Sequence, residues 1–242
     1  MTKIRLQVAL ARSGVASRRK SAKLIESGRI KVNGNVICEP GYRVDAREDT
    51  VVLDKKPVSL NLKEYCLLNK PRGVLSTVRD ERGRKTVLSY IKDKNARFYP
   101  VGRLDKNTTG LIILTNDGDL TYRLTHPKFR IDRVYEAKVD GEVLDNELSR
   151  IKAGIIIDGK KARPENITLK KRSKFFTCLS VTLKEGRKRE VRRLFESVGH
   201  EVLELKRVSY GPLGLKGLKE GSVRPLGEDE VLALRRCVGL ER

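Results

Sequence analysis

GRLDKNTTGLIILTNDGD, residues 102–119, joins a charged loop to an apolar strand and then to a turn. The run from Gly110 to Thr115 predicts a buried strand, and the following Asp-Gly pair indicates a turn and a helix start. Asp105 precedes this strand and is therefore expected at the mouth of a rigid element, with Arg103 close enough to pair with it. The pattern alone leaves open whether Asp105 is a reactive carboxylate or part of an ordinary polar turn.

Around this stretch, predicted strands outnumber predicted helices, and several strands follow one another across short turns. This order predicts an α+β fold with a mostly antiparallel sheet and flanking helices, not a doubly wound parallel sheet. The predicted strands are 65–69, 111–115, 134–139, 155–157, 166–170, 175–183 and 201–209. The predicted helices are 86–91, 118–125, 145–152, 188–198 and 228–236.

The first 60 residues predict a separate small module of two helices and a β-hairpin. Ser17 is a suitable N-cap for the second helix, and Asn33-Gly34 between alternating apolar residues is a strong hairpin signal. Residues 55–63 contain a proline and no clear period, so we interpret them as a linker. We therefore expect two domains, residues 1–60 and 61–242.

Three cations, Arg18, Arg19 and Lys20, fall in the first turn of that second predicted helix. Cations there oppose the helix dipole, whose positive end favours acidic groups. One interpretation is a small tolerated cost. The interpretation we prefer is a phosphate bound at the helix start, held by the free N–H groups and the cations.

The charge of the whole chain points to a polyanionic partner. It has 53 Lys and Arg against 31 Asp and Glu, a net charge of +22. Such an excess is typical of a nucleic-acid binder, although a solvated basic surface is the simpler alternative. An anionic membrane is a weaker candidate, because no amphipathic helix carries a bulky apolar face.

Several classes of protein are disfavoured. No stretch approaches the roughly 20 apolar residues of a membrane span, and no signal peptide is evident. Four scattered cysteines and two histidines suit neither a zinc site nor a disulfide framework, so we expect no metal and a reducing, cytoplasmic location. Phosphate-loop, dinucleotide and zinc-hydrolase motifs are missing, so we expect no cofactor.

A second charged segment, KEGRKREVRRLF (residues 184–195), predicts a basic helix. Its apolar face would comprise Val191, Leu194 and Phe195, at the i, i+3 and i+4 spacing of one helix side. Its cations form either a solvated face or a phosphate-binding surface. The candidates for RNA contact are Arg187, Lys188 and Arg189.

Four strings resemble, in order, the motifs of the RsuA/RluB-type rRNA pseudouridine synthases. They are NKPRGVLST (69–77), GRLDKNTTGLIILTNDGDL (102–120), RVYEAKV (133–139) and EGRKREVRRLF (185–195). The N-terminal module resembles the S4 RNA-binding domain. The resemblance covers nearly the whole chain and implies a pseudouridine synthase domain behind an S4 domain.

The resemblance also implies roles for individual residues. Asp105 would be the essential catalytic carboxylate, and Arg192 the arginine that keeps it ionised. Tyr135 would stack on the flipped uracil and serve in proton transfer. Arg103 would fill the space that the base leaves, and Val191 would line the uracil pocket. The family often has lysine where this chain has Arg133, so no role is carried over to that position.

The resemblance thus implies an isomerase that flips a uridine out of rRNA and converts it to pseudouridine. The run LKRVSYGPLGLKGLKEGSVRPL (205–226) is more similar to members that act on the large subunit (23S). The alternatives are the same reaction on small-subunit (16S) rRNA and a non-catalytic S4-type rRNA-binding or assembly factor. A monomer is expected, with rRNA as partner.

Overall fold

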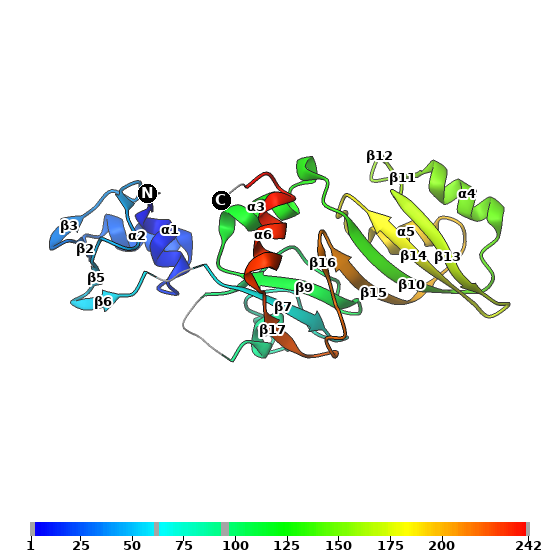
Figure 1. Cartoon of the computed structure of the whole chain (residues 1–242), viewed down its shortest axis with the longest axis horizontal. Helices are drawn as coiled ribbons and strands as arrows, with labels where there is room; N and C mark the ends of the chain where they lie inside the picture. Colours follow the sequence, from blue (N-terminus) through cyan, green and yellow to red (C-terminus); the bar gives the residue numbers. More distant parts are fainter. Residues whose placement is uncertain (1–2, 61–62, 93–96, 241–242) are drawn as a thin grey trace. The chain divides into compact units, whose positions relative to one another are not determined.

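The computed structural model describes residues 3–60, 63–92 and 97–240 (Figure 1). The chain divides into two compact units. One contains Met1–Glu64, Ile91–Tyr99 and Thr115–Asp117, and the other contains Tyr65–Tyr90, Pro100–Leu114 and Gly118–Arg242.

The first unit contains the predicted helix–helix–hairpin arrangement. Its helices are α1 (Leu6–Arg12) and α2 (Arg18–Glu26), and its four-stranded sheet has the order β3 (Asn35–Ile37), β2 (Ile30–Val32), β5 (Val51–Leu53), β6 (Lys56–Val58). A second small sheet pairs β1 (Ile4–Arg5) with β4 (Arg43–Val44). The apolar side chains of both helices and of β2, β4 and β5 form one core.

Two local signals in this unit are confirmed. The Ser17 hydroxyl accepts the Lys20 backbone N–H at 3.3 Å, as an N-cap does. Asn33 and Gly34 connect β2 to β3 with φ values of 50° and 86°, the left-handed conformations that a tight hairpin turn requires.

The expected linker at residues 55–63 is wrong in part. Lys56–Val58 forms strand β6, which pairs with β5 at the edge of the four-stranded sheet. Pro57 concealed this strand, because proline argues against a central strand but is tolerated at an edge. Residues 61–62 of the expected linker lie outside the described residues.

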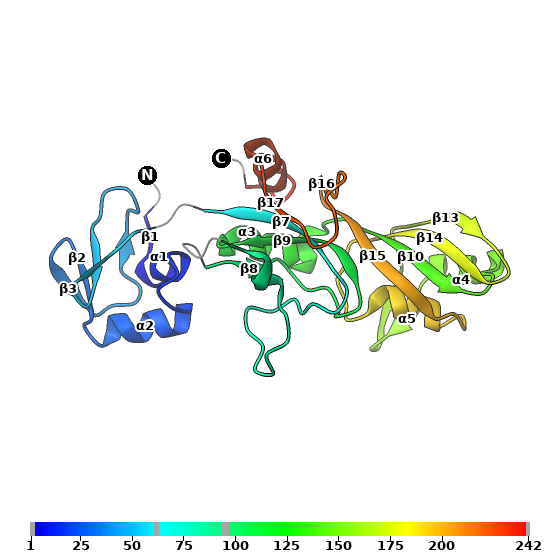
Figure 2. The same cartoon turned by 90° about the horizontal axis from the view of Figure 1, so that it is seen from below.

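The second unit is built on a nine-stranded sheet, seen edge-on in Figure 2. Its main path runs β13 (Asn166–Arg172), β14 (Phe176–Leu183), β10 (Arg133–Asp140), β15 (Val202–Tyr210), β9 (Thr109–Thr115), β7 (Tyr65–Lys70), β17 (Val223–Pro225). Strand β16 (Leu213–Gly214) pairs with β15, and β8 (Tyr99–Pro100) with β9. The β9–β15 pair is parallel, whereas β10 pairs with β14 and β15 antiparallel. The predicted α+β class with a mostly antiparallel sheet is confirmed.

The remaining elements surround this sheet. They are α3 (Gly118–Thr125), α4 (Asp145–Ala153), α5 (Glu190–Glu196), α6 (Glu228–Arg236), the 3-10 turns η1 (Val87–Tyr90) and η2 (Pro127–Phe129), and the hairpin β11 (Ile155–Ile157)–β12 (Lys160–Ala162). Figure 2 shows α4 and α5 on the same side of β10, β14 and β15. Of the predicted helices, 86–91 is therefore a short 3-10 turn. No helix in the described residues is long and apolar enough to cross a bilayer.

The backbones of β9 and β15 approach each other closely at Gly110. Where these two strands pair, a side chain at Gly110 would place its Cβ 2.2 Å from the backbone oxygen of Arg207. Gly110 also has a φ of 104°, which a residue with a Cβ rarely adopts. Glycine is therefore required for these two strands to meet, and it fixes Arg207 next to the start of β9.

Candidate active site

The loop between β8 and β9 carries Asp105, and a buried serine fixes its backbone. The Ser76 hydroxyl donates to the Leu104 carbonyl at 2.9 Å and accepts the Leu104 N–H at 3.1 Å. At the other side, the Thr108 N–H donates to the Asp105 carbonyl at 3.1 Å. Asp105 is therefore displayed from a backbone that is bonded on both sides.

A second support comes from the segment that follows β7. The Lys106 carbonyl accepts the Gly73 N–H at 2.8 Å and the Lys70 ammonium at 3.3 Å. Lys70 also donates to the Pro71 carbonyl at 3.0 Å. Residues 69–77, which were identified from the sequence only as a motif, thus hold the Asp105 loop in place through hydrogen bonds.

Strand β10 brings Tyr135 to the same region. Tyr135 is 9% exposed and lies opposite Val181 on β14 and Arg207 on β15. Directly opposed residues share a face of a sheet, so Tyr135 and Arg207 point to one side. That side also holds α5, which follows the loop of residues 184–189.

These elements enclose a cavity of about 310 Å³. Seven of the residues predicted from the sequence line it, namely Arg103, Asp105, Tyr135, Arg187, Lys188, Arg189 and Val191. Its apolar wall includes Leu104, Leu183 and Leu205. The cavity thus combines the loop carboxylate of Asp105, the rings of Tyr135 and Tyr210, and a basic rim.

Asp105 makes no direct ionic contact in this structure. Within the described part of the chain, no cationic nitrogen lies within 4.0 Å of its carboxylate and no hydrogen bond reaches its oxygens. The pairing expected with Arg103 is therefore not formed, and Arg103 itself is exposed. The carboxylate is left available to a ligand in the cavity.

Arg192 is buried and is not among the residues that line the cavity. It is 8% exposed, and its Nη1 donates to the Val202 carbonyl at 2.5 Å. Burial is the main cause of a lowered Arg192 pKa, the charge of Arg189 lowers it further, and the charge of Asp105 raises it. Arg192 and Asp105 thus interact through their charges, although they form no ion pair.

Two of the three cations at the basic rim of the cavity already have protein partners, so fewer are free to bind a ligand than the sequence suggests. Arg187 donates to the carbonyls of Lys160 and Lys161, each at 3.0 Å, and also pairs with Glu185. Arg189 pairs with Glu196 at 3.1 Å. Lys188 is exposed and, among the described residues, has no carboxylate within 4.0 Å.

A second carboxyl group lies in the cavity wall but is already engaged. Glu190 is 4% exposed, and its carboxylate accepts the Arg187 backbone N–H at 3.1 Å. Burial raises the pKa of Glu190. Asp105 is therefore the carboxylate of the cavity with its oxygens unbonded within the described chain.

Sequence reasoning gave no role to Lys70, whose side chain is fully buried. Burial lowers the pKa of Lys70 to about 8, while the charge of Asp105 opposes this change. Lys70 therefore contributes positive charge beneath the Asp105 loop. The available signal was a lysine at the end of an apolar strand, inside the string 69–77.

Arg207 and Arg133 are two further buried cations that line the cavity. Arg207 is 2% exposed, bonds the Leu111 carbonyl through Nε at 2.7 Å, and has an Nη2 without a partner in the described residues. Arg133 is satisfied by the carbonyls of Ile131, Lys184 and Leu124, so it holds the cavity wall together. The signal was an arginine at a position where strand alternation calls for an apolar residue.

The three N-terminal candidates lie in the first unit. Arg18, Arg19 and Lys20 are all exposed at the start of α2. No acidic residue occupies that first turn, and the hydroxyl of Ser17 caps its Lys20 N–H. Across the described ranges, no group of three or more histidine, cysteine or acidic side chains is arranged to hold a metal ion.

Comparisons with known proteins bear on this arrangement. Residues 64–197 match the family described as RNA pseudouridylate synthase, and residues 4–51 match the S4 domain. An uncharacterised RNA pseudouridine synthase from Aquifex aeolicus is 44% identical over 242 residues, which is 100% of this chain and 97% of that protein. The ribosomal large subunit pseudouridine synthase B of Bacillus subtilis is 43% identical over 96% of this chain and 95% of its own.

A solved structure agrees with the sequence relatives. A crystal structure of a pseudouridylate synthase superposes with a TM-score of 0.65 at 27% identity, covering 96% of this chain and 99% of that one.

Proposed function

The chain belongs to the RNA pseudouridylate synthase family and carries an S4 domain, and from this premise we propose that it modifies one uridine of large-subunit (23S) rRNA. The similarity to the Bacillus subtilis large-subunit enzyme supports this choice of subunit. The observation that carries the catalytic assignment is Asp105, a carboxylate with unbonded oxygens in a cavity that also contains Tyr135.

The reaction rearranges bonds without any net loss of atoms. The N1–C1′ bond breaks, the uracil turns over, C5 joins C1′, the proton of C5 leaves and N1 gains a proton. Asp105 acts as the nucleophile that holds either the ribose or the base during this exchange. Its rigid loop, bonded through Ser76 and Lys106, keeps the attacking oxygen in place.

Tyr135 and Val191 form the base pocket in this proposal. The ring of Tyr135 stacks on the flipped uracil, and its hydroxyl takes part in moving the C5 proton. Val191 is 3% exposed and covers the base from the apolar side. The uracil is thereby held between an aromatic and an aliphatic wall.

The cations have three proposed roles: they help to flip the base out of the RNA, place positive charge near Asp105 and bind the RNA backbone. Arg103, exposed beside Asp105, enters the space left by the flipped base and offsets part of the unstacking cost. Arg192 contributes positive charge close enough to interact with the charge of Asp105. Lys188 contacts the RNA backbone at the rim, and Arg187 and Arg189 contact it with the guanidinium N–H groups that their protein partners do not use. Arg18, Arg19 and Lys20 contact the RNA backbone on the S4 domain.

Small-subunit (16S) rRNA is the alternative substrate, since the same pocket accepts any flipped uridine.

The four cysteines are free thiols, which accords with action in a reducing cytoplasm. We further propose that the chain acts as a monomer without a cofactor, and that residues 1–60 and 61–242 are its two domains.

The test is chemical mapping of pseudouridine in 23S and 16S transcripts incubated with the protein. We expect one new pseudouridine in 23S and none in 16S. Asp105→Asn should abolish the product while leaving the RNA dissociation constant unchanged, because it removes charge and nucleophilicity at nearly constant shape.

Two outcomes would contradict parts of this proposal. Product from Asp105→Asn at the native rate would exclude Asp105 as the nucleophile. Product in 16S and not in 23S would leave the chemistry intact and reassign the subunit. Tyr135→Phe, which keeps the ring and removes the hydroxyl, separates stacking from proton transfer.

A further inference from the structure

The turn that joins β13 to β14 has an unusual composition. Residues 170–176 read KKRSKFF, and no acidic residue occurs from 166 to 184. We call residues 170–176 the β13–β14 tip; Figures 1 and 2 show it at the free end of these two strands. Strand β13 is an edge strand of the sheet, so the tip is covered by no further strand.

Phe175 at this tip is 85% exposed, so its ring packs against almost nothing. The turn is closed without it, because the Ser173 hydroxyl donates to the Phe176 carbonyl at 2.8 Å and accepts the Phe176 N–H at 3.1 Å. Only the backbone of Phe175 is used, its carbonyl accepting the Gly141 N–H at 3.0 Å. The fold therefore gives no reason for an aromatic side chain at this position.

The lysines of the tip are not held by ion pairs to any described residue. Within the described part of the chain, none of Lys170, Lys171 and Lys174 has a carboxylate within 4.0 Å. All three are exposed. Lys171 lies 5.4 Å from the centre of the Phe176 ring, and Lys138 of β10 lies 4.8 Å from the same ring. Cations and aromatic rings are thus interleaved on one small surface.

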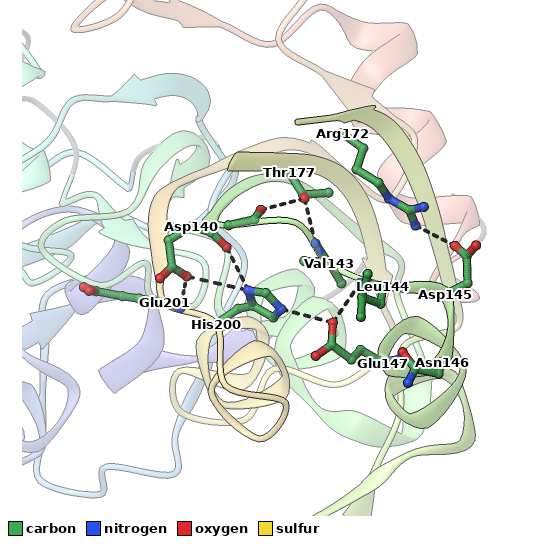
Figure 3. Close-up of polar contacts among 11 residues, drawn as sticks. Asp140, Val143, Leu144, Asp145, Asn146, Glu147, Arg172, Thr177, His200 and Glu201 are labelled. Atoms are coloured by element: carbon green, nitrogen blue, oxygen red, sulfur yellow. Dashed lines mark hydrogen bonds and ion pairs between the residues drawn. The ribbon is translucent and has the colours of Figure 1, made fainter. Parts of the chain in front are cut away.

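The base of the tip is rigid (Figure 3). The Thr177 hydroxyl donates to the Gly141 carbonyl at 2.9 Å and accepts the Val143 N–H at 3.0 Å. Arg172 bonds Asp145 at the start of α4. A ligand that binds the tip therefore meets a surface whose backbone is already ordered, which lowers the entropy cost of binding.

Edge protection is the competing explanation of the lysines. Charged residues on edge strands prevent pairing with other chains, and a register shift between Leu169 and Lys171 has the same effect. This explanation does not account for Phe175, because an exposed aromatic ring next to an edge strand favours aggregation. A partner that uses both the charge and the ring accounts for the whole composition.

We propose that the β13–β14 tip is an additional RNA-binding site, separate from the catalytic cavity and from the S4 domain. Lys170, Lys171 and Lys174 contact phosphates, and Phe175 stacks on an unpaired base of the same RNA. Phe176 lies five residues along β14 from Val181, the partner of Tyr135, so the tip is about 17 Å from the cavity along the strand. It therefore binds nucleotides away from the modified uridine and selects RNAs with an unpaired base there.

The charge test uses matched triple variants in the Asp105→Asn background, so that binding is measured without turnover. Lys170→Glu/Lys171→Glu/Lys174→Glu should raise the dissociation constant for 23S and 16S transcripts by at least about tenfold. The control, Lys92→Glu/Lys216→Glu/Lys219→Glu, makes the same change in net charge at other exposed lysines and should have a much smaller effect.

The ring test separates stacking from general apolar contact. Phe175→Ala should weaken binding by about five- to a hundredfold, and Phe175→Leu by nearly as much, whereas Phe175→Tyr should bind normally. In the otherwise native enzyme, product formation at saturating RNA should be unchanged in all three. Circular dichroism and thermal melting check that each variant folds.

Three results would overturn the proposal. They are unchanged binding by the lysine variant, equal losses in the lysine variant and its control, and equal binding by Phe175→Ala and Phe175→Tyr. Glutamate protects an edge strand as lysine does, so edge protection alone predicts unchanged binding. A transfer of activity from 23S to 16S would alter the proposed function and leave this result unaffected.

Discussion

At the residue scale, the buried cations around Asp105 differ in their hydrogen-bond partners. Arg133 is satisfied by backbone carbonyls and holds the wall, whereas Lys70 is bonded to two carbonyls beneath the loop. Arg207 keeps an Nη2 without a partner among the described residues. A buried cation that lacks an ion pair destabilises the folded state, so these residues lower the stability of the fold.

Lys70 makes this cost measurable as a pH dependence of stability. Its pKa is about 8 in the folded protein against 10.5 for an ordinary lysine. Between these values the unfolded chain binds a proton that the folded chain has released, so raising the pH favours the folded state. We expect the free energy of unfolding of the native protein to rise by about 1–3 kcal/mol relative to Lys70→Met over this range.

Urea unfolding at pH 7.5 and pH 10.5 checks this expectation. The difference between the two proteins isolates Lys70, because all other groups titrate in both. A difference that stays constant or falls with pH would show that Lys70 is not the titrating group.

At the scale of elements, the first turn of α2 carries charges that oppose the dipole of the helix. Arg18, Arg19 and Lys20 occupy its first turn, where the helix dipole disfavours cations. Arg18→Glu/Arg19→Glu should therefore stabilise α2 by about 0.5–2 kcal/mol and, at the same time, weaken RNA binding several-fold.

Hydrogen exchange of the α2 amides and RNA titration test these opposite effects. Lys23→Glu is the control, since it places an acid in the last turn of the same helix and should destabilise it. Loss of α2 protection together with loss of binding in the double variant would indicate simple unfolding and contradict the prediction.

Element by element, prediction succeeded where the local pattern was strong. The helices α3 and α6 begin and end where the periodicity placed them, because caps and apolar spacing act within the element. Strand β6 was not predicted because Pro57 argues against a strand when only neighbouring residues are considered. The strand forms through its pairing with β5, which is a tertiary contact. Strands β8, β12, β16 and β17 have two or three residues each, too few to show a period.

The site was predictable only in its composition. Asp105, Tyr135 and Val191 do line one cavity, as the motifs indicated. The partners of the cations depend on folding: Arg187 bonds a hairpin about 27 residues earlier, and Arg192 bonds the Val202 carbonyl. Sequence spacing carries no information about such contacts, so it overstated how many arginines are free to bind RNA.

For the whole molecule, the net charge of +22 predicts salt-sensitive binding. Each phosphate contact should contribute about 0.7–0.9 to the log–log slope of affinity against salt. We expect affinity for rRNA to fall more than about tenfold between about 50 and 200 mM salt, while the rate at saturating RNA stays nearly constant. The slope should be smaller by about 2–3 in the β13–β14 tip lysine variant, and a flat response of the native protein would contradict the prediction.

The pairing of β9 with β15 has a consequence for biosynthesis. Thr109 and Gly110 of β9 pair with Lys206 and Arg207 of β15. Strand β7 pairs with β17, which is synthesised much later and ends at Pro225. A chain emerging from the ribosome therefore carries β9, the strand next to Asp105, long before its partner β15 exists, and such distant pairings form slowly. The α1–α2 contacts, in contrast, join segments that are synthesised together. The nascent protein can acquire its S4 fold early, but it becomes an enzyme only when its last strands have been made.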